Sequence, residues 1–433
     1  MRGATLVLAA LAVAGCAGRK PDPTPPVPPA VERPGAEQPG VERPGAGQPV
    51  VARPSPTPPA APPPPSVPPQ AVRPPAAVAP APVPVAPPAE RITFASIPGW
   101  AEGDHAPALI ALRDACEGLS GRAADATMGG PVLGGEPVFG RMADWRPICA
   151  EAASAPPGQA TAFFERWFEP VSIRGAGRAE ATLFTAYFEP ELRGSLTRGG
   201  PYQHALYRMP QGLVPGSPQV ARAAIDAGSL ANRGLELAWV DDPVDSFFLH
   251  IQGSGRVRLP DGRVLRVGYA GKNGHSYIPI GRVLVERGVM ALEDVSLQSI
   301  RAWLAANPDR AFELMAQNPS YVFFEPKPEL SADLGPIGSF GTPLPAMRAV
   351  AVDRRHVPLG APVWVDFESP VGPVRRLTVA LDTGGAIKGP RRADFFFGSG
   401  AAAGEAAGAT RAYGRMLALA PTAALRRVFR AGT

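Results

Sequence analysis

Between residues 91 and 175 the hydrophobic positions recur at helical spacing. A second helical pattern covers 145–153, and a third segment carries four aromatic residues that we expect in a core. The first helix is predicted over 107–119, where four apolar residues would share one side: Leu109, Leu112, Cys116 and Leu119. The aromatic residues of the third segment are Phe163, Phe164, Trp167 and Phe168.

From about residue 178 the pattern becomes typical of strands. Residues 256–259 and 264–267 flank the sequence Pro-Asp-Gly, which predicts a hairpin because these residues favour a tight turn. Other short apolar or alternating runs predict further strands at 180–188, 245–251, 347–352, 362–367 and 376–381.

Helices are predicted at three places in this part of the chain. Segments 217–226 and 296–306 each begin with a Ser that can cap a helix, and the Ala-rich segment 401–419 predicts a closing helix. Many short strands and few helices favour barrels over a doubly wound sheet. The fold class expected is mainly β with some α.

Proline divides the 433 residues into two parts. Residues 21–90 hold 27 of the 56 Pro, and a sequence of the type VERPG recurs there every ten residues. Such a segment cannot bury enough apolar surface to offset its ordering entropy, and it favours extended polyproline geometry. We therefore expect residues 17–90 to be a disordered tether, and the remaining residues to form the folded body.

The first 16 residues are typical of an export signal. Arg2 precedes a short apolar stretch, and Val-Ala-Gly-Cys at 13–16 is similar to a bacterial lipobox. Lipidation of Cys16 would anchor the chain to a membrane. Ala17 rather than Asp after this Cys is typical of outer-membrane sorting, so we expect the periplasmic face of the outer membrane.

Charge and cysteine content exclude some classes of protein. The formal net charge of +5 is small and dispersed, which argues against a nucleic-acid partner. No apolar run reaches the length of about 20 residues that a membrane span needs. Cys116 and Cys149 are the two remaining cysteines. An exported compartment permits a disulfide between them, and two buried free thiols remain the alternative.

Candidate chemistry lies in the last hundred residues. Asp353 and Asp382 each end an apolar run, and Asp394 is followed directly by three Phe. Burial against these rings would raise the pKa of Asp394 and let it hold a proton, as a general acid requires. The alternative is structural: Asp394 would cap a turn and Asp382 would be a strand-end carboxylate with all its hydrogen bonds made.

Other reaction chemistries have weaker support. Gly384 and Gly385 would let the backbone approach a ligand, or would form a plain turn. Asp-Thr-Gly at 382–384 is also found in aspartic proteases, but the chain holds one copy where such a site needs two. The five His are scattered, and no nucleophile elbow or phosphate-binding glycine loop is present, so we expect no metal and no cofactor.

Several long motifs carry a family resemblance. LTVALDTGGAIKG (377–389) and DFFFG (394–398), with MRAVAVD (347–353) before them, resemble the three-Asp or 3D domain. Four motifs upstream are similar to membrane-bound lytic murein transglycosylases of the A family: FTAYFEP (184–190), FLHIQGSG (248–255), YAGKNG (269–274) and NPSYVFF (318–324).

The resemblance implies an architecture. It implies a double-psi β-barrel domain, with a second, smaller β-barrel-like domain inserted into it and a glycan groove between the two. Residues 91–186 would supply the N-terminal helices and the first barrel segment, and 187–335 the inserted domain. Residues 336–433 would complete the barrel and add a C-terminal helix.

The resemblance also implies an activity. The family cleaves the β-1,4 bond between N-acetylmuramic acid and N-acetylglucosamine without water, and we expect an exo-acting glycan lyase. Asp394 would be the general acid and base, Asp382 an electrostatic support and Asp353 an orienting residue. Within the motifs we assign glycan binding to Tyr187, Gln252, Ser254, Gly384, Gly385 and Lys388.

Two alternatives remain open at this stage. The chain could be a hydrolytic muramidase, or a wall scaffold that binds glycan without cleaving it. In each case the partners expected are peptidoglycan strands, a membrane through the N-terminal lipid, and proteins of the cell-wall machinery through the Pro-rich arm.

Overall fold

The computed structural model describes residues 89–174, 181–213 and 218–430. The predicted signal peptide, Cys16 and nearly all of the predicted tether therefore lie outside the described residues. The predicted boundary of the tether at residue 90 is wrong by two residues. Ala89 and Glu90 belong to strand β1 (Ala89–Arg91), which pairs with β4 (Phe168–Ile173) in the folded body.

The helical N-terminal part is present as predicted. The helices are α1 (Ala106–Leu119), α2 (Met142–Ser154) and α3 (Ala160–Trp167), with 3-10 turns at Phe94–Ser96 and Pro157–Gln159. The short strands β2 (Val132–Leu133) and β3 (Glu136–Pro137) form a hairpin between α1 and α2. Phe163 and Phe164 are buried in the main core, as expected from their spacing.

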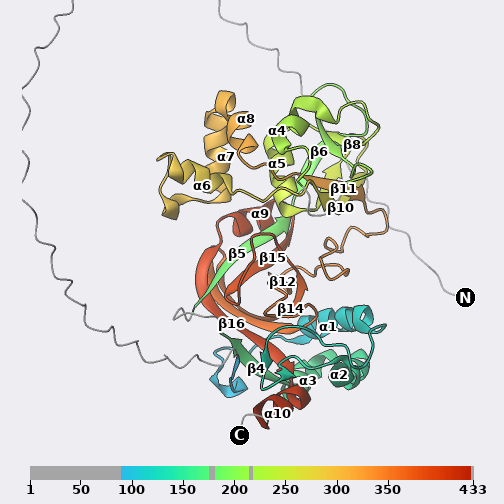
Figure 1. Ribbon diagram of the computed structural model, residues 1–433, viewed down its shortest axis with the longest axis vertical. Helices are drawn as coiled ribbons and strands as arrows, with labels where there is room; N and C mark the ends of the chain where they lie inside the picture. The colour runs from blue at the N-terminus through green and yellow to red at the C-terminus, as the bar shows by residue number, and fades with distance from the viewer. Residues whose placement is uncertain (1–88, 175–180, 214–217, 431–433) are drawn as a thin grey trace, which may run out of the picture. The chain divides into compact units, whose positions relative to one another are not determined.

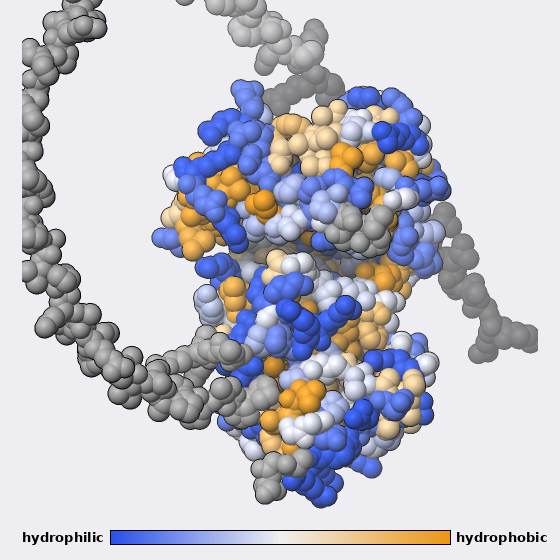
Figure 2. All heavy atoms as spheres, in the orientation of Figure 1, coloured by the Kyte–Doolittle hydropathy of each residue, from blue (hydrophilic) through white to orange (hydrophobic). Residues whose placement is uncertain are grey.

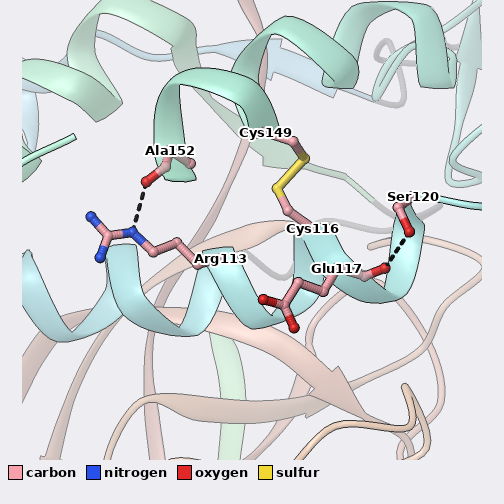
Figure 3. The surroundings of a disulfide bond; sticks show 6 residues. All are labelled: Arg113, Cys116, Glu117, Ser120, Cys149 and Ala152. Carbon is pink, nitrogen blue, oxygen red and sulfur yellow. Dashed lines mark hydrogen bonds between the residues drawn. A yellow bond between two sulfur atoms is a disulfide. The ribbon is translucent and has the colours of Figure 1, made fainter. Parts of the chain in front are cut away.

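A disulfide joins α1 to α2. Cys116 and Cys149 are bonded, and their Cα atoms lie 5.4 Å apart (Figure 3). Beside the disulfide, the Arg113 Nε donates to the carbonyl oxygen of Ala152 at 2.7 Å, so the same two helices are also tied by a hydrogen bond. The structure thus has the disulfide, one of the two alternatives that the sequence left open.

A closed six-stranded barrel forms the centre of the fold (Figure 1). Its strands follow the order β16, β13, β14, β12, β15 and β5, and β5 then pairs with β16 to close the ring. Phe184, Phe367 and Phe395 pack against one another and are buried in its core. Trp364 is also fully buried, and its ring packs against Trp100 of the N-terminal part. The bounds are β5 (Thr182–Glu189), β12 (Ala349–Val352), β13 (Pro362–Ser369), β14 (Gly372–Asp382), β15 (Arg392–Ser399) and β16 (Arg411–Pro421).

A second sheet follows β5 after one residue, Pro190. It has six strands in the order β11, β10, β9, β6, β8 and β7. Among the described residues no hydrogen-bonded pairing joins its edge strands, although Tyr207 of β7 packs in one cluster with Phe323 of β11. The barrel-like form of this domain therefore stays a prediction. Its strands are β6 (Glu191–Ser195), β7 (His204–Tyr207), β8 (Glu236–Val240), β9 (Gly255–Arg258), β10 (Val264–Lys272) and β11 (Val322–Pro326).

A buried carboxylate connects the two sheets. Glu189, at the end of β5, pairs with Arg256 of β9 at 2.8 Å and with Arg266 of β10 at 2.6 Å. It also accepts a hydrogen bond from the hydroxyl of Ser399 in β15. Two guanidinium groups satisfy a carboxylate that is almost fully buried, which is what burial of such a charge requires.

Helices lie between and beside the strands of the second sheet. Ser296 caps α7 by accepting from the backbone N–H of Ser299, as its position predicted. The helix expected at 217–226 is shorter and starts later, at Arg222. The helices are α4 (Arg222–Ala224), α5 (Pro243–Gln252), α6 (Ile280–Glu286), α7 (Leu297–Ala306) and α8 (Pro308–Ala316), with a π turn at Ile225–Ser229 and a 3-10 turn at Leu292–Asp294.

The strand predicted at 245–251 is wrong, because this segment lies in α5. Asp242 caps the helix by accepting from the backbone N–H of Val244, Pro243 occupies its first position, and Gly253 ends it with a φ of 83°. These start and stop signals outweigh a short apolar run, which fits a buried strand and a buried helix equally well.

The single closing helix predicted at 401–419 is also wrong. It is divided into α9 (Ala401–Gly408) and strand β16, and the chain closes with α10 (Thr422–Arg430). Ala favours helix locally, but β16 is flanked by β13 and β4, and this tertiary pairing decides its conformation. Because α5, α6, α8 and α10 were not among the predicted helices, the fold is mixed α/β rather than mainly β. In Figure 2 hydrophobic residues form only small patches on the visible face, so the apolar residues are largely in the cores.

Candidate active site

The barrel places Asp382 and Asp394 on one face. Asp382 ends β14 and Asp394 lies on β15, and both are in register with Ala351 of the strand between them, β12. Residues in register on neighbouring strands point to the same side of a sheet. The two carboxylates therefore lie on either side of the small side chain of Ala351.

A β-bulge in β14 produces this arrangement. Val350 pairs with Ala380, but Ala351 pairs with Asp382, so Leu381 is the extra residue. Without the bulge, Leu381 would occupy the position opposite Ala351 and Asp382 would point to the other face. The bulge thus orients Asp382 toward Asp394.

Asp394 lies where its neutral form is favoured more than in water. It sits on a strand rather than capping a turn, and it accepts a hydrogen bond from the hydroxyl of Thr185 on β5. That hydroxyl in turn accepts from the guanidinium of Arg392 at 2.7 Å. Burial raises the pKa of Asp394 and outweighs Arg392 and Thr185, which lower it; the charge of Asp382 raises it further.

Asp382 is held by hydrogen bonds to both oxygens. Its Oδ1 accepts from the backbone N–H of Ser339 at 2.8 Å, the Ser339 hydroxyl at 2.6 Å and the N–H of Thr383 at 2.8 Å. Its Oδ2 accepts from the hydroxyl of Tyr187 at 3.0 Å. These four donors hold the carboxylate of Asp382 in a fixed orientation.

Asp353 lies apart from this pair and has a different environment. Its carboxylate accepts from the guanidinium of Arg355, with a shortest distance of 2.6 Å, and from the backbone N–H of Gly389 at 2.8 Å. These donors, Arg355 above all, hold the pKa of Asp353 well below its usual range. Asp353 therefore ties the loop after β14 to the end of β12.

Two tyrosines border the carboxylate pair. Burial and the neighbouring charges of Asp382 and Asp394 raise the pKa of Tyr187 well above 10, so its hydroxyl remains a donor to Asp382. Tyr277 comes from the second domain, between β10 and α6. Burial raises the pKa of Tyr277 to about 12, and the charge of Asp394 adds to this shift. The second domain thus brings a phenol within electrostatic range of Asp394.

The arrangement can supply one proton beside one fixed negative charge. A neutral carboxylic acid at Asp394 can donate, and its conjugate base would be stabilised by Thr185 and Arg392. The anion of Asp382 can stabilise positive charge that develops nearby. Across the described ranges, no group of three or more His, Cys, Asp or Glu side chains is arranged to hold a metal ion.

Comparison with known proteins identifies the family. Residues 183–325 match the model of the MltA specific insert domain, and residues 348–420 match the 3D domain. Membrane-bound lytic murein transglycosylase A of Escherichia coli (strain K12) is 38% identical over 259 residues, covering 57% of this chain and 68% of that protein. The chain belongs to the MltA family.

Solved structures of the family agree with the fold. The membrane-bound lytic murein transglycosylase from Agrobacterium tumefaciens is 34% identical with a TM-score of 0.69, covering 78% of this chain and 99% of that one. E. coli MltA with bound chitohexaose is 28% identical with a TM-score of 0.58, covering 77% and 94%. The described residues contain no helix long and apolar enough to span a bilayer, although the homologues are named membrane-bound.

The predicted glycan-binding residues fall into two groups around the pair of carboxylates. Gln252, at the end of α5, accepts from the backbone N–H of Phe188 at 3.1 Å, which places it beside Tyr187. Ser254 follows two residues later, before β9.

The second group is the loop that joins Asp382 to the contact with Asp353. A Cβ on Gly384 would lie 2.6 Å from a side-chain carbon of Ile387, so any larger residue would force the buried Ile387 to shift. Gly385 and Lys388 are exposed, and a Cβ on Gly385 would meet open space.

Sequence reasoning missed four residues that shape this site. Thr185 lies inside a motif quoted for the family resemblance, and Arg392 is two residues before Asp394, so both could have been considered. Ser339 and Tyr277 carried no local signal, because only the folded chain brings them to Asp382 and Asp394.

Proposed function

We propose that this chain is a lytic transglycosylase that cleaves the β-1,4 bond between N-acetylmuramic acid and N-acetylglucosamine in murein. The observation that carries the proposal is the pair formed by Asp394, with its raised pKa, and the anchored Asp382 in a chain of the MltA family. The chitohexaose-bound relative supports a glycan as the ligand.

In the proposed reaction a single residue acts as acid and then as base. Protonated Asp394 donates to the leaving glycosidic oxygen as the bond to C1 breaks. Its carboxylate, now stabilised by the Thr185 hydroxyl and the charge of Arg392, takes the proton from the C6 hydroxyl of the muramoyl residue. The C6 oxygen bonds to C1 and leaves a 1,6-anhydromuramoyl end.

Asp382 would support the transition state without bonding to the sugar. A fixed anion lowers the energy of an oxocarbenium-like centre when it needs no reorganisation. Hydrolysis commonly requires a second carboxylate as base or nucleophile. Both oxygens of Asp382 are already engaged by these four hydrogen bonds, which disfavours attack on the sugar or activation of a water and so favours transglycosylation over the muramidase alternative.

The domain arrangement proposed is a double-psi barrel, with residues 187–335 inserted and the glycan groove between the two domains. The parallel pairs β12–β14 and β5–β15 support this barrel type. Gln252, Ser254, Gly384, Gly385 and Lys388 would contact the strand there. We also propose exo action, a lipid on Cys16 and location at the periplasmic face of the outer membrane.

Digestion of purified murein sacculi tests the function. Transglycosylation predicts products with anhydromuramoyl ends, and hydrolysis predicts reducing ends heavier by one water molecule, which mass spectrometry separates. Glycan binding with no products would leave the scaffold alternative. Early release of disaccharide units, rather than long fragments, would indicate exo action.

A further inference from the structure

A cationic cavity adjoins the residues that hold Asp382 and Asp353. Its volume is about 590 Å³, and its lining includes the side chains of Arg122, Arg354 and Arg355 together with Ser339. Among the described residues that line it, none is Asp or Glu. By contrast, a larger cavity of about 730 Å³ includes Asp114, Glu117 and Asp333 in its lining and would repel an anion.

The three guanidinium groups are not equally engaged. Arg355 forms an ion pair with Asp353 at 2.6 Å, and Arg122 donates to the carbonyl oxygen of Thr127 at 2.7 Å. Arg354 is exposed and makes no hydrogen bond or ion pair with another described residue. Two positive charges at this cavity are therefore not balanced by a carboxylate, and Arg354 is available to a ligand.

The cavity is next to the proposed reaction centre. Ser339 lines it and also donates to Asp382 through both its N–H and its hydroxyl. Arg355 lines it and holds Asp353. A ligand in the cavity would thus lie one side chain away from two of the three Asp residues.

We infer that this cavity binds a carboxylate of the peptide attached to the muramoyl residue of the substrate, an inference that rests on the proposed function. Murein differs from plain chitin chains in bearing such peptides, which carry free carboxylates. An extended peptide of three residues spans about 10 Å, which exceeds the length of the single Ser339 side chain that separates the cavity from Asp382. The planar guanidinium of Arg354 suits bidentate recognition of a carboxylate.

Binding assays with the full chain test this inference. In an Asp394→Asn background, which prevents turnover, Arg354→Gln is compared with the unchanged background for two ligands: peptide-bearing glycan strands, and the same strands after an amidase has removed the peptides. Because the site is open to solvent, we expect Kd for the peptide-bearing strands to rise about three- to tenfold. Kd for the stripped strands should not change.

Two further variants sharpen the result. Arg354→Lys keeps the charge but loses the planar fork, so part of the lost affinity should return. Arg233→Gln removes an exposed arginine of the second domain and should have no effect on either ligand. Equal affinity of the Arg354→Gln and unchanged proteins for peptide-bearing strands overturns the inference, as does an equal loss for both ligands. Absence of anhydromuramoyl products from the wild-type chain would instead refute the proposed function.

Discussion

Asp394 lies on β15 and Asp353 directly follows the neighbouring strand β12, yet their surroundings move their pKa values in opposite directions. Around Asp394, burial dominates and raises the pKa, although Thr185 and Arg392 oppose it. Around Asp353, the donors of Arg355 and Gly389 dominate and lower the pKa. The same side chain is thus prepared to carry a proton in one place and to remain an anion in the other.

This comparison separates chemistry from structure. An acid whose proton is retained by burial can give that proton to a substrate, and the fold gains nothing from its ionised form. A carboxylate that is ionised and paired holds loops together and has no proton to give. We therefore expect substitutions at Asp394 to change rates, and substitutions at Asp353 to change stability.

The largest expected effect is that of Asp394→Asn. The variant should lose about 10²- to 10⁴-fold in the rate of anhydromuramoyl product formation, because proton donation is lost. Its free energy of unfolding at pH 7 should not fall, since burial makes the ionised Asp394 unfavourable in the folded state. Product analysis by mass and urea unfolding measure the two quantities.

The matched control is Asp366→Asn. Asp366 lies on the barrel strand β13 and forms an ion pair with Arg375. This variant should form anhydromuramoyl products at the wild-type rate. The assignment of Asp394 would be wrong if Asp394→Asn formed products at nearly the wild-type rate, or if a folded Asp382→Asn were the only inactive variant.

Removal of the disulfide tests stability away from the reaction centre. Cys116→Ser combined with Cys149→Ser opens a loop with a sequence separation of 33 residues. The free energy of unfolding should fall by about 3 to 4 kcal/mol in the chain-entropy model. Product formation at a temperature where the variant is folded should be unchanged. A rate loss comparable to that of Asp394→Asn would show that α1 and α2 support the site directly.

Asp353→Asn should cost about 1 to 3 kcal/mol of stability, near the lower limit because Arg355 is largely exposed. The lowered pKa of Asp353 sets the pH dependence. Its contribution is present above the unfolded value of about 3.9 and is lost as pH falls through the lower folded pKa. Urea unfolding from pH 7 downwards should show that the difference in the free energy of unfolding between wild type and variant becomes smaller. A difference that stays constant over this range would contradict the assigned role of Asp353.

The smallest effect expected is a shift in the pH profile. Product formation should decrease as pH rises through the folded pKa of Asp394, because the acid must start protonated. Thr185→Val removes a donor that lowers this pKa, so the alkaline limb should move to higher pH. A limb that stays in place would mean that another group titrates. Thr378→Val, at a buried hydroxyl bonded to Val363 instead, is the control and should leave the limb unchanged.

The sequence alone predicted the family and those helices, strands and turns that have strong local signals. The Pro-Asp-Gly hairpin, the Ser296 cap, the apolar runs that end at Asp353 and Asp382, and the three Phe after Asp394 are all readable in short windows, because turn chemistry and apolar periodicity are local. The long motifs then connected these acids to the 3D domain, as the matches to both family models confirm.

Tertiary structure alone decided how these pieces act together. Segment 401–419 is rich in Ala, yet its second part forms strand β16, because pairing with β13 and β4 determines its conformation. The bulge at Leu381 that turns Asp382 toward Asp394 leaves no trace in the composition of β14. The contacts of Thr185 with Asp394 and of Ser339 with Asp382 join residues 209 and 43 positions apart. A pKa depends on burial and on such distant neighbours, which is why the different roles of three similar Asp residues appear only in the folded chain.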